Sequence, residues 1–525
     1  MIRKQNLVIV FRTDASQQIG SGHVMRCLTL AEALREAGGT IAFITRNHLG
    51  NLNDYIKSKE FNIHSLPDRN ESNLSESLSG YEKWLGVQQS QDAKDTIQVL
   101  SEIDPDWLIV DHYALDNNWE GELRPYTKKI MVIDDLANRC HDCDVLLDQN
   151  YFHNQDRYSQ LLSPSTIQLL GPQYALLRKC FAEKRKSFIH NSNEINRVFI
   201  FFGGTDPDNL TTMALKAMTH PNLQNMSLDV VIGSANLHQE SVREQVQENP
   251  SAKLHIQVEN IAELMVKADI AFGAGGTTTW ERMVVGLPSI VVTIAENQIT
   301  FIKNLDQAGY LNWIGNTDQV NVQSIQRALL DAIQNPQLLL EQSKKSQELV
   351  EGLGNQLITK LLTVGPEIET LTVRRADSSD CLLYWHWVND PVVRESSFNQ
   401  EHIKWEDHQS WFDQQLNNFG SILFVVECSF GPLGQVRFNR SGLHYTINYS
   451  VARQFRRLGL SKAVLSKAID YFRQEQLFIL ISYVKKTNVA SIKVFEQLSF
   501  HEIFPPLEEG VRCFRLPFSQ IVQHG

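Results

Sequence analysis

Short apolar runs alternate with helix-like patterns through the first 365 residues of the chain. The first run, Leu7–Phe11, predicts a buried strand, and a helix with apolar residues three and four positions apart follows it up to Gly38. Three more strand-sized runs also end in polar residues: Ile41–Ile44, Trp107–Val110 and Ile130–Ile133. This alternation predicts a parallel α/β sheet, which binds ligands at the carboxyl ends of its strands.

A second α/β unit is predicted from about Arg197 onward. Its expected elements are the strands Val198–Phe202, Ile270–Phe272 and Ser289–Thr293 and the helices from Asn209 and over Thr277–Val285. A glycine cluster, Gly273–Gly276, joins one of these strands to the next helix. Two consecutive units of this kind predict two Rossmann-like domains that face a cleft, at residues 1–165 and 166–365.

The pattern changes after Gly365, and a smaller α+β domain is predicted over residues 371–525. Apolar and polar residues alternate along residues 444–451, as in a strand with one buried face. The loop Arg456–Ser461 and an amphipathic helix come next. The predicted fold class is therefore α/β, with two Rossmann-like domains followed by a C-terminal α+β domain.

Composition and charge narrow the class of protein. At about 150 residues per domain, the length of 525 residues suggests three or four domains. With 49 Lys and Arg against 60 Asp and Glu, the net charge is −11, which argues against a general nucleic-acid binder. No apolar run reaches the roughly 18 residues of a membrane helix, so we expect no membrane span and a cytoplasmic location.

The seven cysteines, an odd number, are expected to be free thiols of a reducing compartment. Cys140 and Cys143 form the one CxxC motif of the sequence. A zinc site would need a second pair at similar spacing, and the sequence contains none. We interpret the motif as a loop with two incidental thiols, with a thioredoxin-like redox pair as the alternative.

The loop after the first strand combines glycines with a histidine at a helix start. Gly20 and Gly22 let the backbone turn sharply, and the free N–H groups of the helix N-terminus can hold an anion. His23 lies at that terminus, where the helix dipole disfavours imidazolium, so it is a candidate general base. The alternative is that His23 only caps the helix.

The glycine cluster of the second unit ends at another helix start. Gly275 and Gly276 can form a backbone nest suited to a diphosphate, with the hydroxyl groups of Thr277 and Thr278 beside it. Glu281, one turn into the helix, can accept hydrogen bonds from the hydroxyls of a ribose. Two such turns on consecutive α/β units predict a cleft for a nucleotide diphosphate.

The first 365 residues also carry the motifs of a known enzyme family in order. They are Arg12–Ser16, Gly20–Cys27, Asp111–Tyr113, Gly171–Arg178, Phe202–Pro207, Gly273–Glu281 and Ala295–Gln298. On these stretches the region resembles the UDP-sugar hydrolases of pseudaminic acid biosynthesis, which remove UDP from UDP-2,4-diacetamido-2,4,6-trideoxy-β-L-altropyranose. That family is similar to inverting glycosyltransferases of the two-Rossmann (GT-B) type, with water as acceptor. The implied context is nonulosonic acid synthesis for flagellin glycosylation.

The resemblance implies an inverting hydrolysis in which His23 deprotonates water. The second glycine loop would stabilise the departing UDP, and Glu281 would hold its ribose. Further substrate-binding residues carried over from the family motifs are Arg12, Gly22, Tyr113, Arg178 and Asn297. For Arg12 and Arg178 a structural ion pair stays open as an alternative, and no metal is expected.

The C-terminal region carries motifs of another family. Arg456-x-x-Gly459-x-Ser461 and the segment Asn488–Phe500 resemble the acetyl-CoA loop and a late conserved segment of GCN5-related N-acetyltransferases. The resemblance implies acetyl-CoA as cosubstrate, with its pyrophosphate on N–H groups at a helix start. The implied contacts are Arg456, Arg457, Gly459, Ser461 and Asn488. For Asn488, a plain turn asparagine is the alternative.

Phe495 departs from the family pattern, because many members place there a tyrosine that protonates the leaving thiolate. Phenylalanine cannot donate a proton. Either another group or water does so, or the step proceeds without a donor, or the domain binds CoA without turnover.

Together these patterns predict a bifunctional enzyme. The C-terminal domain would acetylate the 4-amino group of a UDP-linked diamino-trideoxyhexose, and the N-terminal pair would hydrolyse the product to free sugar and UDP. One alternative is a GT-B glycosyltransferase with a sugar or lipid acceptor and a separate acetyltransferase. The other is a hydrolase with a catalytically silent CoA-binding module.

Overall fold

The computed structural model describes residues 7–68, 80–154, 156–185, 195–258, 260–456, 458–475, 479–503 and 510–516. The chain divides into two compact units. One comprises residues 1–140, 147–160 and 169–359, and the other comprises residues 141–146, 161–168 and 360–525. The domain boundaries expected at residues 165, 365 and 371 stay predictions.

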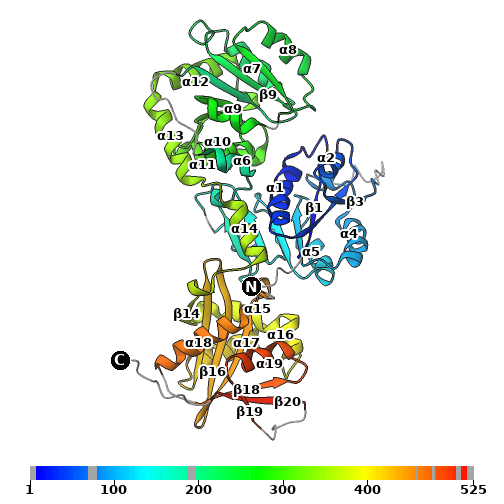
Figure 1. Ribbon diagram of the computed structural model, residues 1–525, viewed down its shortest axis with the longest axis vertical. Coiled ribbons are helices and arrows are strands. Elements are labelled where there is room, and N and C mark those ends of the chain that lie inside the picture. Colours follow the sequence, from blue (N-terminus) through cyan, green and yellow to red (C-terminus); the bar gives the residue numbers. More distant parts are fainter. Residues whose placement is uncertain are drawn as a thin grey trace. The chain divides into compact units, whose positions relative to one another are not determined.

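The first sheet (Figure 1) is built around the strand that was expected at Leu7–Phe11. Its strands are β1 (Val8–Thr13), β2 (Thr40–Arg46), β3 (Asn62–Leu66), β4 (Trp107–Asp111), β5 (Ile130–Ile133), β6 (Val145–Asp148) and β7 (Ile167–Leu170). Their order is β3-β2-β1-β4-β5-β6-β7, and the pairings among β1 to β5 are parallel. The predicted parallel sheet is confirmed, with strand ends that differ by a few residues.

The second sheet is parallel throughout. Its strands are β8 (Arg197–Phe201), β9 (Ser227–Ile232), β10 (Ala252–Ile256), β11 (Ile270–Ala274), β12 (Ser289–Thr293) and β13 (Asn312–Asn316), in the order β10-β9-β8-β11-β12-β13. Val198 and Ile200 of β8 belong to one buried apolar cluster, and Phe199 belongs to another. Because successive side chains of a strand point to opposite faces, helices cover both faces of this sheet.

Helices connect the parallel strands. They are α1 (Gly22–Glu36), α2 (Asn53–Ser58), α3 (Glu82–Leu85), α4 (Gln89–Ile103), α5 (Asn117–Leu123), α6 (Lys179–Lys184), α7 (Leu210–Ala217), α8 (Gln239–Gln247), α9 (Ile261–Lys267), α10 (Thr278–Val285), α11 (Glu296–Gln307), α12 (Val322–Gln334), α13 (Pro336–Leu349) and α14 (Gly354–Thr363). The helices expected from Asn209 and Thr277 begin one residue later, because these two residues are N-caps. Among the residues that the structure describes, no helix is long and apolar enough to cross a membrane.

The third sheet is mixed, in the order β14-β15-β16-β17-β18-β20-β19. Its strands are β14 (Thr372–Arg375), β15 (Ser421–Cys428), β16 (Gly431–Ser441), β17 (His444–Val451), β18 (Ile479–Lys485), β19 (His501–Ile503) and β20 (Val511–Leu516). The helices of this unit are α15 (Cys381–Asn389), α16 (Pro391–Ser396), α17 (Trp405–Leu416), α18 (Ser461–Glu475) and α19 (Val489–Gln497). Strands β14 to β17 are antiparallel neighbours and β17 pairs with β18 in parallel, so the predicted α+β class is confirmed.

Helices lie on both faces of this mixed sheet (Figure 1). The ring of Phe438 on β16 stacks on Phe472 of α18, with 4.3 Å between ring centroids. The neighbouring Arg437 points to the other face, where its guanidinium carbon lies 5.0 Å from the ring centre of Trp411 on α17. The alternation predicted for residues 444–451 follows the same rule, since Tyr445 also packs on Phe472.

Five charged side chains are enclosed near the carboxyl ends of β1 and β2. Arg12 binds Asp14 through Nη1 at 2.7 Å and Asp92 through Nη2 at 2.7 Å. Arg46 binds Asp92 at 2.6 Å and Asp95 at 3.2 Å. Burial alone would raise the pKa of Asp92, but Arg12 and Arg46 hold it below its usual value. With two arginines and three aspartates, each guanidinium of this network has carboxylate partners inside the protein, where water cannot screen them.

A second enclosed carboxylate lies at the end of β6. Asp148 Oδ2 accepts hydrogen bonds from Arg157 Nη1 at 2.9 Å and from the hydroxyl of Tyr158 at 3.2 Å. Burial, reinforced by the nearby charge of Asp135, raises the pKa of Asp148 to about 8. This carboxyl group is therefore largely protonated in the folded protein at neutral pH.

Replacing Asp92 with Ala should strongly destabilise the protein, because it leaves Arg12 and Arg46 enclosed without their shared partner. We expect a loss of about 3–5 kcal/mol in the free energy of unfolding. Urea unfolding followed by tryptophan fluorescence measures it. The control is Asp54→Ala, which removes an ion pair of 3.9 Å on the surface and should change nothing measurable. Equal stabilities of the two variants would contradict the role of the network.

Replacing Asp148 with Asn should change how stability depends on pH. The pKa of Asp148 is about 8 in the folded state and about 3.9 in an unfolded chain, so the folded state binds more protons between these values. The wild type therefore loses stability through this group as the pH rises from about 4 to about 8, and Asp148→Asn removes that loss. Urea unfolding at several pH values should show the variant gaining stability relative to the wild type as the pH rises. A difference independent of pH would refute this.

Candidate functional site

His23 is joined to a carboxylate and an arginine at the carboxyl end of β4. Its Nδ1 lies 2.6 Å from Asp111 Oδ1, and Arg26 donates to both oxygens of Asp111, at 2.6 and 2.7 Å. Burial alone would raise the pKa of Asp111, but Arg26 and His23 hold it well below its usual range. An ionised carboxylate only accepts, so Nδ1 carries the proton and Nε2 is the ring nitrogen left for a ligand.

Tyr113 and Asn297 lie beside this group, as the sequence predicted for one site. The rings of His23 and Tyr113 meet edge to face, with centroids 4.6 Å apart. The Tyr113 hydroxyl donates to Asp135 at 2.5 Å and accepts from Asn297 Nδ2 at 3.1 Å. This last bond joins the first Rossmann-like sheet to the start of α11 after the second sheet.

Two further aromatic residues surround the same point. Trp84 stacks on Tyr113 at 5.5 Å and lies 6.1 Å from the ring of His23, while Tyr81 lies 4.8 Å from Trp84. The sequence analysis missed both residues, because aromatic residues three positions apart at the start of a short helix are typical of ordinary packing. Asp111 and Asp135 were also missed as site residues, although they lie one and two positions after expected strands.

Arg12 does not line this site, contrary to the expectation that it contacts the substrate. Its side chain is 0% exposed and its guanidinium is bound by Asp14 and Asp92. Arg12 is therefore in a structural ion pair, as the alternative stated. His112 lies in the same layer, 3.5 Å from Asp14, and burial lowers the pKa of His112 to about 3. Arg12 and His112 are thus buried in the layer below the site, and neither side chain is exposed to a ligand.

The second glycine loop stands open at the carboxyl end of β11. No side chain caps the start of α10, so the N–H groups near Gly276, Thr277 and Thr278 are available to an anion. Gly275 is required, because a Cβ there would lie 2.8 Å from Ile302. The structure thus leaves these N–H groups uncapped at the start of α10, and their role as a diphosphate nest stays a prediction. Gly22 stands at the start of α1, where Ser21 likewise gives no side-chain cap.

A positive charge is enclosed behind this loop. Arg282 of α10 is fully buried and donates from Nη2 to the carbonyl of Ala274 at 2.8 Å, while its Nε and Nη1 have no partner in the described structure. Burial lowers the pKa of Arg282 to about 10, which leaves it a cation at neutral pH. Its charge therefore adds to the field of the helix N-terminus. The sequence analysis missed Arg282, because its helix position alone suggested a surface side chain.

Arg178 and Glu281, both predicted to bind substrate, form an ion pair. Arg178 Nη2 lies 3.1 Å from Glu281 Oε1, and both side chains stay partly exposed. Burial raises the pKa of Glu281, although the charge of Arg178 opposes this. The ion-pair alternative for Arg178 is thus realised next to the glycine loop, and the pair remains open to a ligand.

The predicted acetyl-CoA loop runs from Arg456 to the start of α18 at Ser461. Gly459 has a φ of +74°, a conformation that favours glycine, and no atom crowds the position of a Cβ. Arg456 is turned toward the protein, since it donates from Nε to the carbonyl of Val451 at 2.9 Å and from Nη1 to Asp390 at 2.7 Å. Arg457 lies outside the described residues.

Asn488 and Phe495, which the sequence analysis singled out, both make structural contacts. Asn488 caps α19, accepting from the N–H of Ser491 at 3.1 Å, which agrees with the turn alternative. Phe495 is 1% exposed and packs between Phe500 and Phe514, with ring centroids 5.0 and 5.8 Å away. The phenylalanine therefore fills the core of this unit.

Tyr449 brings a hydroxyl group close to Phe495. Its ring lies 5.8 Å from that of Phe495, and its hydroxyl donates to Ser491 Oγ at 3.2 Å. Burial raises the pKa of Tyr449, which keeps the phenol protonated. The sequence placed Tyr449 on the apolar face of its strand and assigned it no chemistry.

Strands β17 and β18 pair only at their beginnings. His444, Tyr445 and Thr446 pair with residues 479–481, whereas β17 continues to Val451 and β18 to Lys485 without further pairing between them. The carbonyls of Ile447 and Val451 accept from Ser482 Oγ and Arg456 Nε, and the other backbone groups of this stretch are not paired with β18, which leaves them to an extended ligand.

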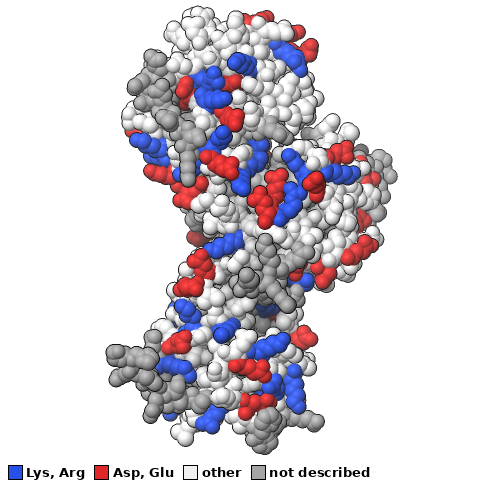
Figure 2. Space-filling view, viewed as in Figure 1, with Lys and Arg blue, Asp and Glu red and all other residues white. Residues whose placement is uncertain are grey.

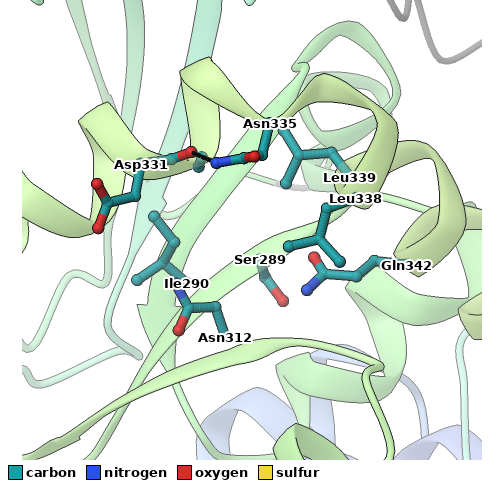
Figure 3. A pocket seen from close by; sticks show the side chains of 9 residues that line it. Ser289, Ile290, Asn312, Asp331, Asn335, Leu338, Leu339 and Gln342 are labelled. Carbon is teal, nitrogen blue, oxygen red and sulfur yellow. Dashed lines mark hydrogen bonds between the residues drawn. The ribbon is translucent and has the colours of Figure 1, made fainter.

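A small cavity lies elsewhere, at the amino ends of β12 and β13 (Figure 3). Ser289 and Asn312 begin these strands and line it, together with residues of α12 and α13 such as Leu339. The glycine loop follows the carboxyl end of β11, at the opposite edge of the parallel sheet, so this cavity takes no part in the site.

In the part of the chain that the structure describes, no group of three or more His, Cys, Asp or Glu side chains could hold a metal ion. None of the seven cysteines forms a disulfide in the described structure, and Cys140 is exposed whereas Cys143 is buried.

Two domain families match this chain. Residues 197–357 match the Glycosyltransferase family 28 C-terminal domain, and residues 370–501 match the Acetyltransferase (GNAT) domain. These matches cover the second Rossmann-like sheet and most of the mixed sheet. They agree with the fold class expected from the sequence.

Similar proteins extend these matches. An uncharacterized protein of Methanocaldococcus jannaschii is 23% identical over 512 residues, which cover 94% of this chain and 96% of that protein. The UDP-2,4-diacetamido-2,4,6-trideoxy-beta-L-altropyranose hydrolase of Campylobacter jejuni is 24% identical over 303 residues, 58% of this chain and 97% of that enzyme. The L-methionine sulfoximine/L-methionine sulfone acetyltransferase of Salmonella typhimurium is 25% identical over 163 residues, 29% of this chain and 94% of that enzyme. The chain is thus homologous to a UDP-sugar hydrolase and to acetyltransferases, and along the sequence its GNAT domain follows the two Rossmann-like sheets.

Proposed function

We propose that this protein is a bifunctional enzyme of pseudaminic acid biosynthesis. Its GNAT domain transfers an acetyl group from acetyl-CoA to the 4-amino group of a UDP-linked diamino-trideoxyhexose. Its Rossmann-like pair then hydrolyses UDP-2,4-diacetamido-2,4,6-trideoxy-β-L-altropyranose to free sugar and UDP. The observation that carries the hydrolytic step is the 2.6 Å contact between His23 and Asp111, and the hydrolase relative supports the choice of sugar.

His23 acts as the general base in this proposal. Asp111 keeps Nδ1 protonated, so Nε2 can take a proton from a water molecule. The water oxygen attacks the anomeric carbon on the side opposite UDP, and the bond from that carbon to the diphosphate oxygen breaks with its electron pair. Attack from the opposite side inverts the configuration.

The departing UDP collects negative charge that the second glycine loop can stabilise. The N–H groups at the start of α10 and the charge of Arg282 behind them are already in place before the reaction, so they need no reorganisation. Glu281 accepts hydrogen bonds from the ribose, and Arg178 orients it through the ion pair.

In acetyl transfer, the sugar amine attacks the thioester carbonyl and gives up one proton to solvent water, and the bond from carbon to sulfur breaks. The CoA thiolate then takes a proton. Phe495 cannot supply it, but the hydroxyl of Tyr449 lies beside Phe495 and is kept protonated by burial. We assign the proton donor role to Tyr449, with acetyl-CoA lying along the unpaired part of β17.

A silent CoA-binding module is the second candidate, supported by the packing of Phe495 and the capping role of Asn488. Supplying the 4-amino UDP-sugar with and without acetyl-CoA distinguishes the two. Release of CoA thiol, followed by UDP release only after acetylation, supports the bifunctional enzyme. UDP release without thiol release supports the silent module, and little UDP release in water alone supports a glycosyltransferase.

Replacing His23 with Ala should lower UDP release from the diacetamido sugar by about two to four orders of magnitude, because no base remains to activate water. Thiol release by the GNAT domain should stay unchanged, which shows that the variant is folded. The control His220→Ala removes a histidine whose Nδ1 bonds only to the nearby N–H of Asn222 in the described structure, and it should hydrolyse normally. A normal rate in His23→Ala would remove this residue from the base role.

Replacing Tyr449 with Phe should lower kcat for thiol release on the order of a hundredfold, because only the proton donor is lost. The KM for acetyl-CoA should not change, since the ring still packs on Phe495. Tyr471→Phe is the matched control, because Tyr471 packs on Phe424 with ring centroids 5.2 Å apart. If Tyr449→Phe keeps the wild-type kcat, another group protonates the thiolate.

A further inference from the structure

One face of the mixed sheet carries polar atoms that find no partner. On β16, Phe438 faces α18, so Gln435 and Arg437 point to the side of α15 and α17. On β17, Tyr449 faces α19, so Ser450 points to that same side as Gln435. Gln435 and Ser450 are direct partners in the β16–β17 ladder. Their side chains are therefore neighbours in the layer between the sheet and α15.

Three of the side chains in this layer are both enclosed and unsatisfied. Gln435, Ser450 and Trp387 are 6%, 7% and 3% exposed, and their Oε1, Oγ and Nε1 atoms have no hydrogen-bond partner in the described structure. A buried polar group without a partner is unfavourable, because it has lost its hydrogen bonds to water. Several of them in one layer indicate that something absent from the chain itself completes their hydrogen bonds.

Trp387 belongs to the same neighbourhood as the strand pair. It lies on the buried side of α15, the helix that packs on β17. Just beyond the end of α15, Asp390 is bound by Arg456, which also binds the carbonyl of Val451. The end of α15 is thereby held at the end of β17, next to Ser450.

Arg437 adds a charge to this layer. Its guanidinium packs on the ring of Trp411, its Nε is enclosed without a partner, and no carboxylate pairs with it among the described residues. Burial lowers the pKa of Arg437, the direction expected for a cation that lacks a counter-charge. A partly buried guanidinium of this kind gains from a ligand that brings an anion or several acceptor oxygens.

The layer also lies beside the proposed path of acetyl-CoA. Ser450 is in the part of β17 that has left β18, where backbone groups are free for an extended ligand. A molecule held by Ser450 and Gln435 can therefore present an amine to the thioester.

We infer that Gln435, Ser450, Trp387 and Arg437 form the acceptor site of the GNAT domain, and that it takes an anionic, oxygen-rich amine of the nucleotide-sugar class and rejects polyamines. This inference rests on the proposed acetyl transfer. Gln435, Ser450 and Trp387 bind hydroxyl and acetamido groups of the sugar, and Arg437 pairs with its diphosphate. A polyamine would bring more positive charge to a guanidinium that already lacks a partner.

Kinetics of the full chain test the site, with thiol release measured at varied UDP-amino sugar and varied acetyl-CoA. Arg437→Met and Gln435→Leu should each raise the KM for the amino sugar at least about tenfold, through loss of a hydrogen bond, and leave the KM for acetyl-CoA within about twofold. Gln435→Leu should also raise the melting temperature of the protein without ligand, because it removes an unsatisfied group. Spermidine should release no thiol.

Thr446→Val is the matched control, since Thr446 shares this face of β17 but its hydroxyl already binds the carbonyl of Asn439 at 3.2 Å. An unchanged KM for the amino sugar in Arg437→Met and Gln435→Leu, a less stable Gln435→Leu protein, or acetylation of spermidine would each overturn the inference. Titration calorimetry distinguishes failure of the acceptor site from failure of the proposed acetyl transfer. If the wild type binds the amino sugar at one more site than the Arg437→Met variant does, yet releases no thiol, the acceptor site is supported and the acetyl transfer is contradicted.

Discussion

The carboxylate of Asp111 holds the N-terminal site together. It stands at the end of a buried strand, so its position is set by the sheet, and it binds Arg26 and His23 at once. An enclosed carboxylate needs such partners. Because Asp111 binds both Arg26 and His23, the ring of His23 is held in one orientation. Arg26 also reaches Asp135, which holds the hydroxyl of Tyr113. Without Asp111, Arg26 would keep only Asp135 as a charge partner, and His23 would lose the carboxylate that fixes its tautomer.

The two enzymatic units must both attract an anionic ligand, and they do so in similar ways. A protein of net charge −11 has no overall field that attracts an anionic nucleotide sugar, and on the face shown in Figure 2 basic and acidic side chains are interspersed. The groups that attract the nucleotide sugar must then lie within the binding sites. Uncapped helix starts supply N–H groups, the enclosed guanidinium of Arg282 supplies charge that water does not screen, and the partly buried Arg437 supplies a second charge. Both arginines lack a carboxylate partner in the described structure, which suits them to ligand charge.

Much of the fold could be predicted, because strand-sized apolar runs and helical spacing are local properties. The expected strands and the glycine loops before α1 and α10 are present. Roles were harder to predict where one residue type serves two purposes. Arg12 stands in a family motif yet belongs to an enclosed ion-pair network, and Asn488 caps a helix. Burial decides between such roles, and burial depends on residues far away in the chain, such as Asp92 for Arg12.

The sequence by itself determined that the chain forms two parallel α/β sheets and a C-terminal α+β domain, and that glycine loops lie at the ends of particular strands. Only the tertiary structure decided which side chains act together. Asp111 reaches His23 across 88 positions, and Gln435 meets Ser450 across a strand pair. The physical reason is that periodicity reports which face of an element is buried, whereas hydrogen bonds and unmatched charges depend on what packs against that face.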